Sequence, residues 1–292
     1  MARERIQRFR WAFVFGLFLF CAELGVAWLA GSLALLADAG HLFLDVVALG
    51  LAYFGARWAL RRPDSRYTYG FRRAEVLAAA VNGFLLLFLV GFVVREALER
   101  LGAPREIWGG PTLAMGVVGF LGNAFMALLL HRHEKSDLNM RAAFLHVLGD
   151  ALGSLAVILA GIAIVLFGKV WVDAAASFFI AGIVLFGALR ILRDAGRVLF
   201  EAVPEDLSFG EIAQTLRSLP GVQDVHDLHV WSLVPGFPML TAHLVLGNCS
   251  LAEADAILAQ ARKILGERFG IEHVTLQAEC AACEGLACNG RN

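Results

Sequence analysis

The sequence predicts a membrane protein in two parts. The first is an all-α transmembrane domain of six helices, and the second is a cytoplasmic α+β domain with the element order αββαβ. The chain of 292 residues is 59% hydrophobic and only 17% charged, a composition typical of integral membrane proteins. The hydrophobic excess is confined to residues 11–193, whereas the chain from about residue 203 has the composition of a small soluble domain. We therefore expect two domains, residues 1–200 and 201–292.

Six apolar segments are long enough to cross a bilayer. They are expected at about residues 11–29, 33–58, 74–94, 111–130, 142–167 and 172–192. The first is interpreted as a membrane helix and not as a signal peptide, because it is too long and lacks a convincing cleavage site. Small residues recur in these segments and let helix backbones approach closely in lipid. Examples are Gly116, Gly119, Gly122, Gly149, Gly153 and Ser154.

Arginine is distributed unevenly among the segments outside the predicted spans. The N-terminal segment and every second connection after it are rich in Arg, whereas the other connections hold no charge, three Arg balanced by three Glu, or one Lys. Because Arg-rich connections stay on the cytoplasmic side, we expect both termini in the cytoplasm and a multi-pass protein of the inner cell membrane. The net charge of −1 gives no indication of a nucleic-acid partner.

Two predicted spans carry the same pair of ionisable side chains. His41 and Asp45 are four residues apart in the second span, and His146 and Asp150 repeat that spacing in the fifth. Each pair lies one turn apart on one helix face, and ionisable groups at this depth face a bundle interior or a water-filled cavity. If the two helices face each other, two nitrogens and two oxygens form a tetrahedral site for Zn²⁺. One copy alone could be a structural hydrogen-bonded pair; the repetition favours a metal or proton pathway.

Other polar residues lie within the predicted spans, among them Glu23, Asp38 and Asn82. Asp38, three residues before His41, could assist metal entry or hydrate the ion, and an interfacial cap is the alternative. Glu23 and Asn82 are interpreted as packing or polar-lining residues and not as ligands.

The soluble tail has a clear pattern of helices and strands. Helices are expected at residues 208–219 and 250–269, and strands at 222–234, 239–246 and 273–278. Ser208 with Glu211, and Ser250 with Glu253, have the spacing of capping boxes at the two helix starts. The resulting order, αββαβ, is similar to that of metallochaperone-type domains.

A second candidate metal site lies in this tail. His226, His243 and Glu279 could meet at one edge of the sheet, with His229, Cys280 and Cys283 nearby. In a regular strand the side chains of His226 and His229 point to opposite faces, so they are not expected to share a site unless the strand is irregular at its start. The Cys280–Cys283 pair favours metal binding or redox sensing over a disulfide framework. Each histidine alone is more often a surface residue, but the group predicts a metal site.

These motifs together resemble the cation diffusion facilitator family of metal transporters, and the resemblance covers nearly the whole chain. It implies a homodimer whose cytoplasmic domains pair, and export of Zn²⁺, often with Cd²⁺ or Co²⁺, in exchange for protons. It also places the transport site on the second and fifth helices, and histidine at positions 41 and 146 is similar to zinc-type members. The residues that carry the resemblance are His41, Asp45, His146, Asp150, the 226–231 strand, Thr241, His243 and the 273–277 strand.

Some departures from relatives in this family are visible. The 66–73 loop has no ligand-type side chain, so no metal site is expected there. Gln277 and Glu279 stand where some bacterial relatives have His and Asp, which weakens a two-metal site copied from them. The trailing Cys280 and Cys283 instead resemble the CxxC tail of eukaryotic-like members.

A proton-coupled mechanism follows from the ligand types. Metal binding requires neutral imidazoles and ionised carboxylates, so Zn²⁺ and protons compete for the same groups. We expect alternating access around a site near the bilayer midplane, with Zn²⁺ also regulating through the tail. The alternatives are an intramembrane metal-dependent enzyme and a membrane-bound metal sensor. No HExxH motif or third histidine cluster supports an enzyme, and a sensor leaves the paired charges in lipid unexplained.

Overall fold

The structure, a computed structural model, describes residues 17–131 and 138–280. Its internal contacts divide the chain into two units. The first comprises Met1–Phe54 and Ala78–Leu192, and the second comprises Gly55–Leu77 and Arg193–Asn292. Each unit is described by itself.

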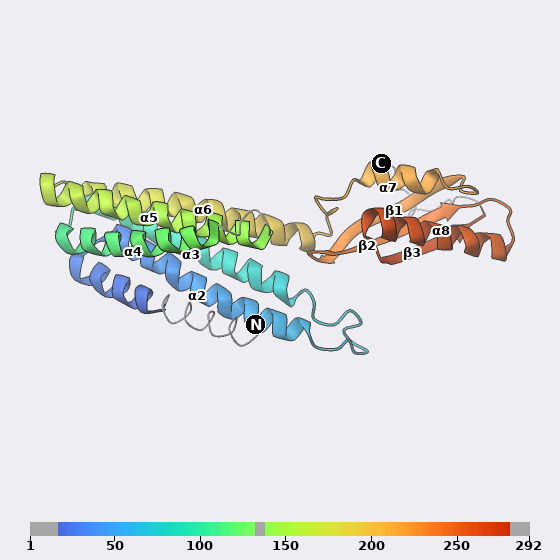
Figure 1. Cartoon of the computed structure of the whole chain (residues 1–292), viewed down its shortest axis with the longest axis horizontal. Helices are drawn as coiled ribbons and strands as arrows, with labels where there is room; N and C mark the ends of the chain where they lie inside the picture. The colour runs from blue at the N-terminus through green and yellow to red at the C-terminus, as the bar shows by residue number, and fades with distance from the viewer. Residues whose placement is uncertain (1–16, 132–137, 281–292) are drawn as a thin grey trace. The chain divides into compact units, whose positions relative to one another are not determined.

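The first unit is built from long apolar helices that lie alongside one another (Figure 1). Among the described residues, five helices are long and apolar enough to cross a membrane, and a shorter apolar helix, Leu17–Ala30, precedes them. The prediction of a helical transmembrane domain is confirmed; the expected first span, 11–29, lies partly outside the described residues. The five helices are α2 (Leu33–Ala59), α3 (Ala74–Gly102), α4 (Gly109–His131), α5 (Leu138–Phe167) and α6 (Trp171–Leu199).

Glycines bring α4 and α5 into close contact. A Cβ added at Gly161 would stand 2.8 Å from the Leu113 backbone, and one at Gly116 would stand 3.1 Å from the Ile158 amide nitrogen. Backbone atoms cannot move aside as a flexible side chain can, so position 161 requires glycine, and position 116 is packed tightly against α5. The packing role predicted for Gly116 is thus confirmed, whereas Gly122 has nothing within 4 Å of its added Cβ.

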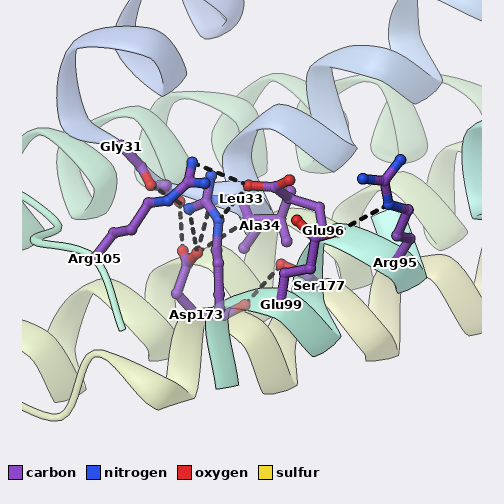
Figure 2. A network of polar contacts seen from close by, with 11 residues as sticks. Gly31, Leu33, Ala34, Arg95, Glu96, Glu99, Arg105, Asp173 and Ser177 are labelled. Carbon is purple, nitrogen blue, oxygen red and sulfur yellow. Dashed lines mark hydrogen bonds and ion pairs between the residues drawn. The ribbon is translucent and has the colours of Figure 1, made fainter. Parts of the chain in front are cut away.

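A fully buried carboxylate from α6 caps the start of α2. Asp173 accepts hydrogen bonds from Ser32 Oγ at 2.5 Å and from the Leu33 and Ala34 amides at 2.6 and 3.4 Å, which satisfies N–H groups that a helix start leaves without partners. Figure 2 shows these contacts beside those of α3. Arg100 donates to the Gly31 carbonyl at 2.5 Å and lies 3.9 Å from Asp173. The contacts fix the first turn of α2 to α3 and α6.

The helix α3 extends eight residues beyond the end expected at Val94, because its charges pair along one face. Arg95 and Glu99 are 2.8 Å apart, and Glu96 and Arg100 are 3.1 Å apart, both at the i, i+4 spacing. Such pairs stabilise a helix, so these residues continue α3 and do not begin a loop. The same correction applies to α6, which ends at Leu199 and not near residue 192.

The second unit contains the predicted αββαβ domain (Figure 1). Its core includes Ile212, Leu216, Leu240, Leu244 and Leu265, all fully buried. The described residues form a sheet of order β1-β2-β3, in which β1 and β2 are antiparallel and β2 and β3 are parallel. Its elements are α7 (Phe209–Arg217), β1 (Asp224–Val234), β2 (Phe237–Val245), α8 (Leu251–Phe269) and β3 (His273–Glu279).

Both helix starts in this domain were predicted from their caps. Ser208 Oγ accepts the Glu211 amide, and Ser250 forms a reciprocal capping box with Glu253. The hydrogen bonds that the Ser250 amide and hydroxyl donate to Glu253 lower the pKa of that carboxyl.

The strand β1 is irregular where its histidines lie. His226 pairs with His243, but His229 pairs with Thr241, so β1 has one more residue than β2 over this stretch. The extra residue is accommodated by a bulge in which Asp227 has φ of +50°, a conformation that Asp tolerates better than most residues. The bulge puts His226 and His229 on the same face of the sheet. The expectation of opposite faces, based on a regular strand, is therefore wrong.

Candidate metal centres

The helices α2 and α5 bring the two repeated His–Asp pairs together. We call His41, Asp45, His146 and Asp150 the membrane cluster. Across the two helices, His41 Nε2 lies 3.4 Å from Asp150 Oδ1, and His146 Nε2 lies 3.4 Å from Asp45 Oδ2. Within each helix the His–Asp distances are 3.9 and 3.8 Å. Each imidazole thus faces both carboxylates, and the two rings are 5.7 Å apart.

The donor atoms of this cluster suit a small divalent cation. One oxygen or nitrogen of His41, Asp45 and His146 lies within 4.8 Å of each of the others, and Asp150 contacts both histidines. The Nδ1 atom of His41 is buried without a hydrogen-bond partner. Burial of such a nitrogen costs free energy unless another atom or ion binds it. Two imidazoles and two carboxylates offer the four-ligand, nitrogen-and-oxygen shell that Zn²⁺ accepts.

Exposure differs among the members of this cluster. The side chain of His146 is 50% exposed, whereas those of His41 and Asp150 are 14% and 11% exposed. His146 is therefore the most exposed member of the cluster, ahead of Asp45 at 27%.

Two further carboxylates are buried beside the membrane cluster. Asp38 lies inside α2 and not at its end, so the alternative role as an interfacial cap is wrong; Asp173 is the residue that caps α2. The Asp38 carboxylate occupies the space that a side chain at Gly153 would fill, 3.1 Å from the added Cβ. Glu23 likewise lies over Gly119, 3.0 Å from that position. Gly119 and Gly153 thus leave room for the two buried carboxyl groups.

The second cluster lies on the sheet. We call His226, His243 and Glu279 the sheet cluster; their ligand atoms all lie within 4.8 Å of one another. His226 Nε2 is 2.8 Å from Glu279 Oε2, and His243 Nδ1 is 2.9 Å from Glu279 Oε1. The His243 contact lacks the angles of a hydrogen bond, so this buried nitrogen has no hydrogen-bond partner. The structure thus brings these three side chains together at the sheet, as predicted.

The charge state of Glu279 suits a ligand. Burial raises the pKa of this carboxyl, but the hydrogen bond with His226 and the charges of His243 and His226 outweigh burial and hold the pKa below its ordinary value. Glu279 is therefore ionised at neutral pH and ready to bind a cation.

The other predicted tail residues lie apart from this cluster. His229 contacts Asp227 at 3.0 Å instead, and Asp227 also lies 3.6 Å from His243. Asp227 was not predicted, although its place between two histidines in the sequence could have drawn attention to it. Cys280 is exposed and does not belong to the sheet cluster, and Cys283 lies outside the described residues.

Comparisons with known proteins cover both parts of the chain. Residues 10–200 match the family model for the cation efflux transmembrane domain, and residues 204–281 match the model for the cation efflux protein cytoplasmic domain. The chain is 39% identical to the zinc transporter ZitB of Escherichia coli over 89% of this chain and 83% of that protein. It is 36% identical to a cadmium, cobalt and zinc/H⁺-K⁺ antiporter of Bacillus velezensis over 87% and 82%.

A third relative is the metal cation efflux system protein CzcD of Cupriavidus metallidurans, 37% identical over 87% of this chain and 80% of that protein. A solved structure of the metal-bound C-terminal domain of CzcD is 34% identical to the aligned part, covering 25% of this chain and 99% of that chain, with a TM-score of 0.23.

Proposed function

Because the chain belongs to the cation diffusion facilitator family of zinc, cadmium and cobalt transporters, we propose that it exports divalent metal ions, Zn²⁺ above all, in exchange for protons. The relatives are transporters and not enzymes, so the intramembrane-enzyme alternative is set aside. The observation that carries the proposal is the approach of both His–Asp pairs, from α2 and α5, to ion-pair distance of each other.

In this mechanism the membrane cluster holds the cargo. Zn²⁺ from the cytoplasm binds His41, Asp45, His146 and Asp150 as these groups give up protons. Movement of the helices then opens the cluster to the other side, where protons compete for the imidazoles and carboxylates and release the metal. His41 and His146 favour Zn²⁺, Cd²⁺ and Co²⁺ over cations that prefer oxygen alone.

The protein acts as a homodimer in the inner cell membrane in this proposal, with both termini in the cytoplasm. The orientation is supported by the alternating distribution of Arg. Dimerisation is supported by the cytoplasmic-domain model, whose short name, ZT_dimer, refers to a dimer.

Zinc flux into proteoliposomes tests the proposal directly. The full-length protein is reconstituted around a zinc-sensitive dye, and flux is followed with and without an imposed pH gradient. We expect zinc flux to accelerate when the pH gradient drives protons across the membrane in the direction opposite to zinc movement. Flux that is insensitive to the gradient would contradict proton exchange, and the absence of flux in folded protein would revive the sensor alternative.

The sheet cluster is proposed to sense cytoplasmic Zn²⁺ and to favour transport when loaded. His243→Ala removes a ligand whose ring nitrogen has no other partner, so we expect it to reduce transport at low zinc and leave the maximal rate at high zinc unchanged. His229→Ala, on the same face but outside the cluster, is the matched control. Zinc-dependent flux measures both, and identical curves for His243→Ala and the parent would refute the sensing role.

A further inference from the structure

The transmembrane unit contains a pair of buried carboxyls that the proposed metal site does not use. Glu23, in the first helix, is 1% exposed, and Asp38, in α2, is 5% exposed. An ionised carboxylate buried in the membrane without a partner is costly, so such residues mark proton or ion pathways. Each residue occupies space that a glycine of a neighbouring helix leaves free, Glu23 at Gly119 and Asp38 at Gly153.

The contacts of the pair are few and uneven. Ser154 Oγ donates to Asp38 Oδ2 at 3.2 Å, and Asn123 Nδ2 donates to Ser154 Oγ at 3.4 Å. Glu23 Oε2, in contrast, is buried without any hydrogen-bond partner. Glu23 Oε1 and Ser154 Oγ each lie 3.0 Å from the point where a Cβ on Gly119 would stand, so Glu23 and the serine that binds Asp38 lie against the same glycine. The two carboxyls therefore share one polar cluster.

The charges around this cluster are mostly acidic. In the part of the chain that the structure describes, no salt bridge joins Glu23 or Asp38 to a basic side chain. The charges of Asp38 on α2 and Asp150 on α5 act on Glu23, and those of Asp150, His41 and Asp45 act on Asp38; Asn123 on α4 is neutral. Two acids that close together in a dry site cannot both be ionised unless a cation or a proton is present.

A proton fits this cluster better than a metal ion. The donors are oxygens only, without the nitrogen or sulfur that Zn²⁺ favours. The space is also close-packed against Gly119 and Gly153, where an added Cβ would already meet carboxyl oxygens at 3.0–3.1 Å. A protonated carboxyl needs no additional volume.

We propose that Glu23 and Asp38 form a proton-binding site, separate from the metal site, that carries a proton in exchange for the outgoing metal ion. The O–H bond that forms on a carboxyl when a proton enters from water on the far side breaks when that proton leaves to water on the cytoplasmic side. Glu23 is coupled to the membrane cluster through the charge of Asp150. A divalent ion bound there favours ionised Glu23 and drives its proton off, and departure of the metal lets a proton return.

This inference rests on the proposed metal–proton exchange, but a separate measurement tests it. Zinc binding to the full-length protein in detergent is followed by calorimetry in buffers of different ionisation enthalpy, which gives the number of protons released. We expect Glu23→Gln to release about one proton fewer per protomer than the parent, with a smaller loss of zinc affinity than a membrane-cluster variant shows. Glu23→Asp, which keeps the carboxyl, should restore the release. The sheet cluster contributes equally to all three proteins and cancels in the comparison.

In proteoliposomes, Glu23→Gln should conduct zinc with a smaller acceleration by a pH gradient than the parent shows, because only the protons of the membrane cluster are then exchanged. If Glu23→Gln does not fold, Asp38→Asn is expected to give the same two results. Release of as many protons as the parent would overturn the inference, and so would a loss of zinc affinity as large as that of a membrane-cluster variant. A parent insensitive to the gradient would instead contradict the proposed function, whatever the variants release.

Discussion

We expect Asp45→Asn and Asp150→Asn each to reduce zinc flux at least about 100-fold, because the loss of a partner that only orients a ligand already costs up to that factor in affinity. Each substitution keeps the shape of the side chain but removes a negative charge that faces both imidazoles. Asp45 Oδ2 lies 3.4 Å from His146, and Asp150 Oδ1 lies 3.4 Å from His41. Either loss leaves an incomplete ligand shell and one fewer charge to offset the dication.

Flux into proteoliposomes measures this effect, with protein amounts matched after reconstitution. Asp194→Asn, an exposed acid at the far end of α6, is the matched control and should behave as the parent does. Near-normal flux in either membrane-cluster variant would show that the metal is carried elsewhere.

We expect Asp173→Ala to destabilise the transmembrane unit by about 3 kcal/mol, the combined cost of a lost helix cap and a broken buried charge contact. The fully buried Asp173 carboxylate accepts from Ser32 and from two amides of the first turn of α2 (Figure 2). Its removal leaves those donors buried without partners and takes away a negative charge that offsets the positive charge of Arg100. Because α2 carries His41 and Asp45, zinc flux should fall as well.

Reversible unfolding in detergent measures the loss of stability. Asp173→Asn keeps one acceptor oxygen and should lose less, about 1–2 kcal/mol. Ser177→Ala is a control on the same helix, since Ser177 donates only to the Asp173 carbonyl at 2.7 Å. Equal stability of Asp173→Ala and Ser177→Ala would contradict the capping role.

The membrane cluster could be predicted from the sequence because its signal is local and repeated. His and Asp at i, i+4 within an apolar helix already define a shared face, and a second copy defines the partner helix. The caps at Ser208 and Ser250 were predictable for the same reason, since each motif spans four residues.

What the sequence did not reveal depends on contacts between distant residues or on local irregularity. Asp173 caps a helix that begins 140 residues earlier in the chain, which no spacing rule indicates. The shared site of Glu23 and Asp38 requires knowing that Gly119 and Gly153 open space for them. The bulge at Asp227 changes which histidines share a face, and strand alternation alone assumes that no bulge is present.

X-ray absorption at the zinc edge, on full-length His243→Ala protein loaded with one Zn²⁺ per protomer, tests the central claim most directly. Without the sheet cluster, the account predicts four nitrogen or oxygen ligands at about 2.0–2.1 Å, with the outer-shell scattering of two imidazoles and no sulfur. It also predicts that Asp150→Asn, added to this background, changes that shell. A sulfur ligand, a shell of six oxygens, or a spectrum unaffected by Asp150→Asn would contradict the assignment of His41, Asp45, His146 and Asp150 as the transport site.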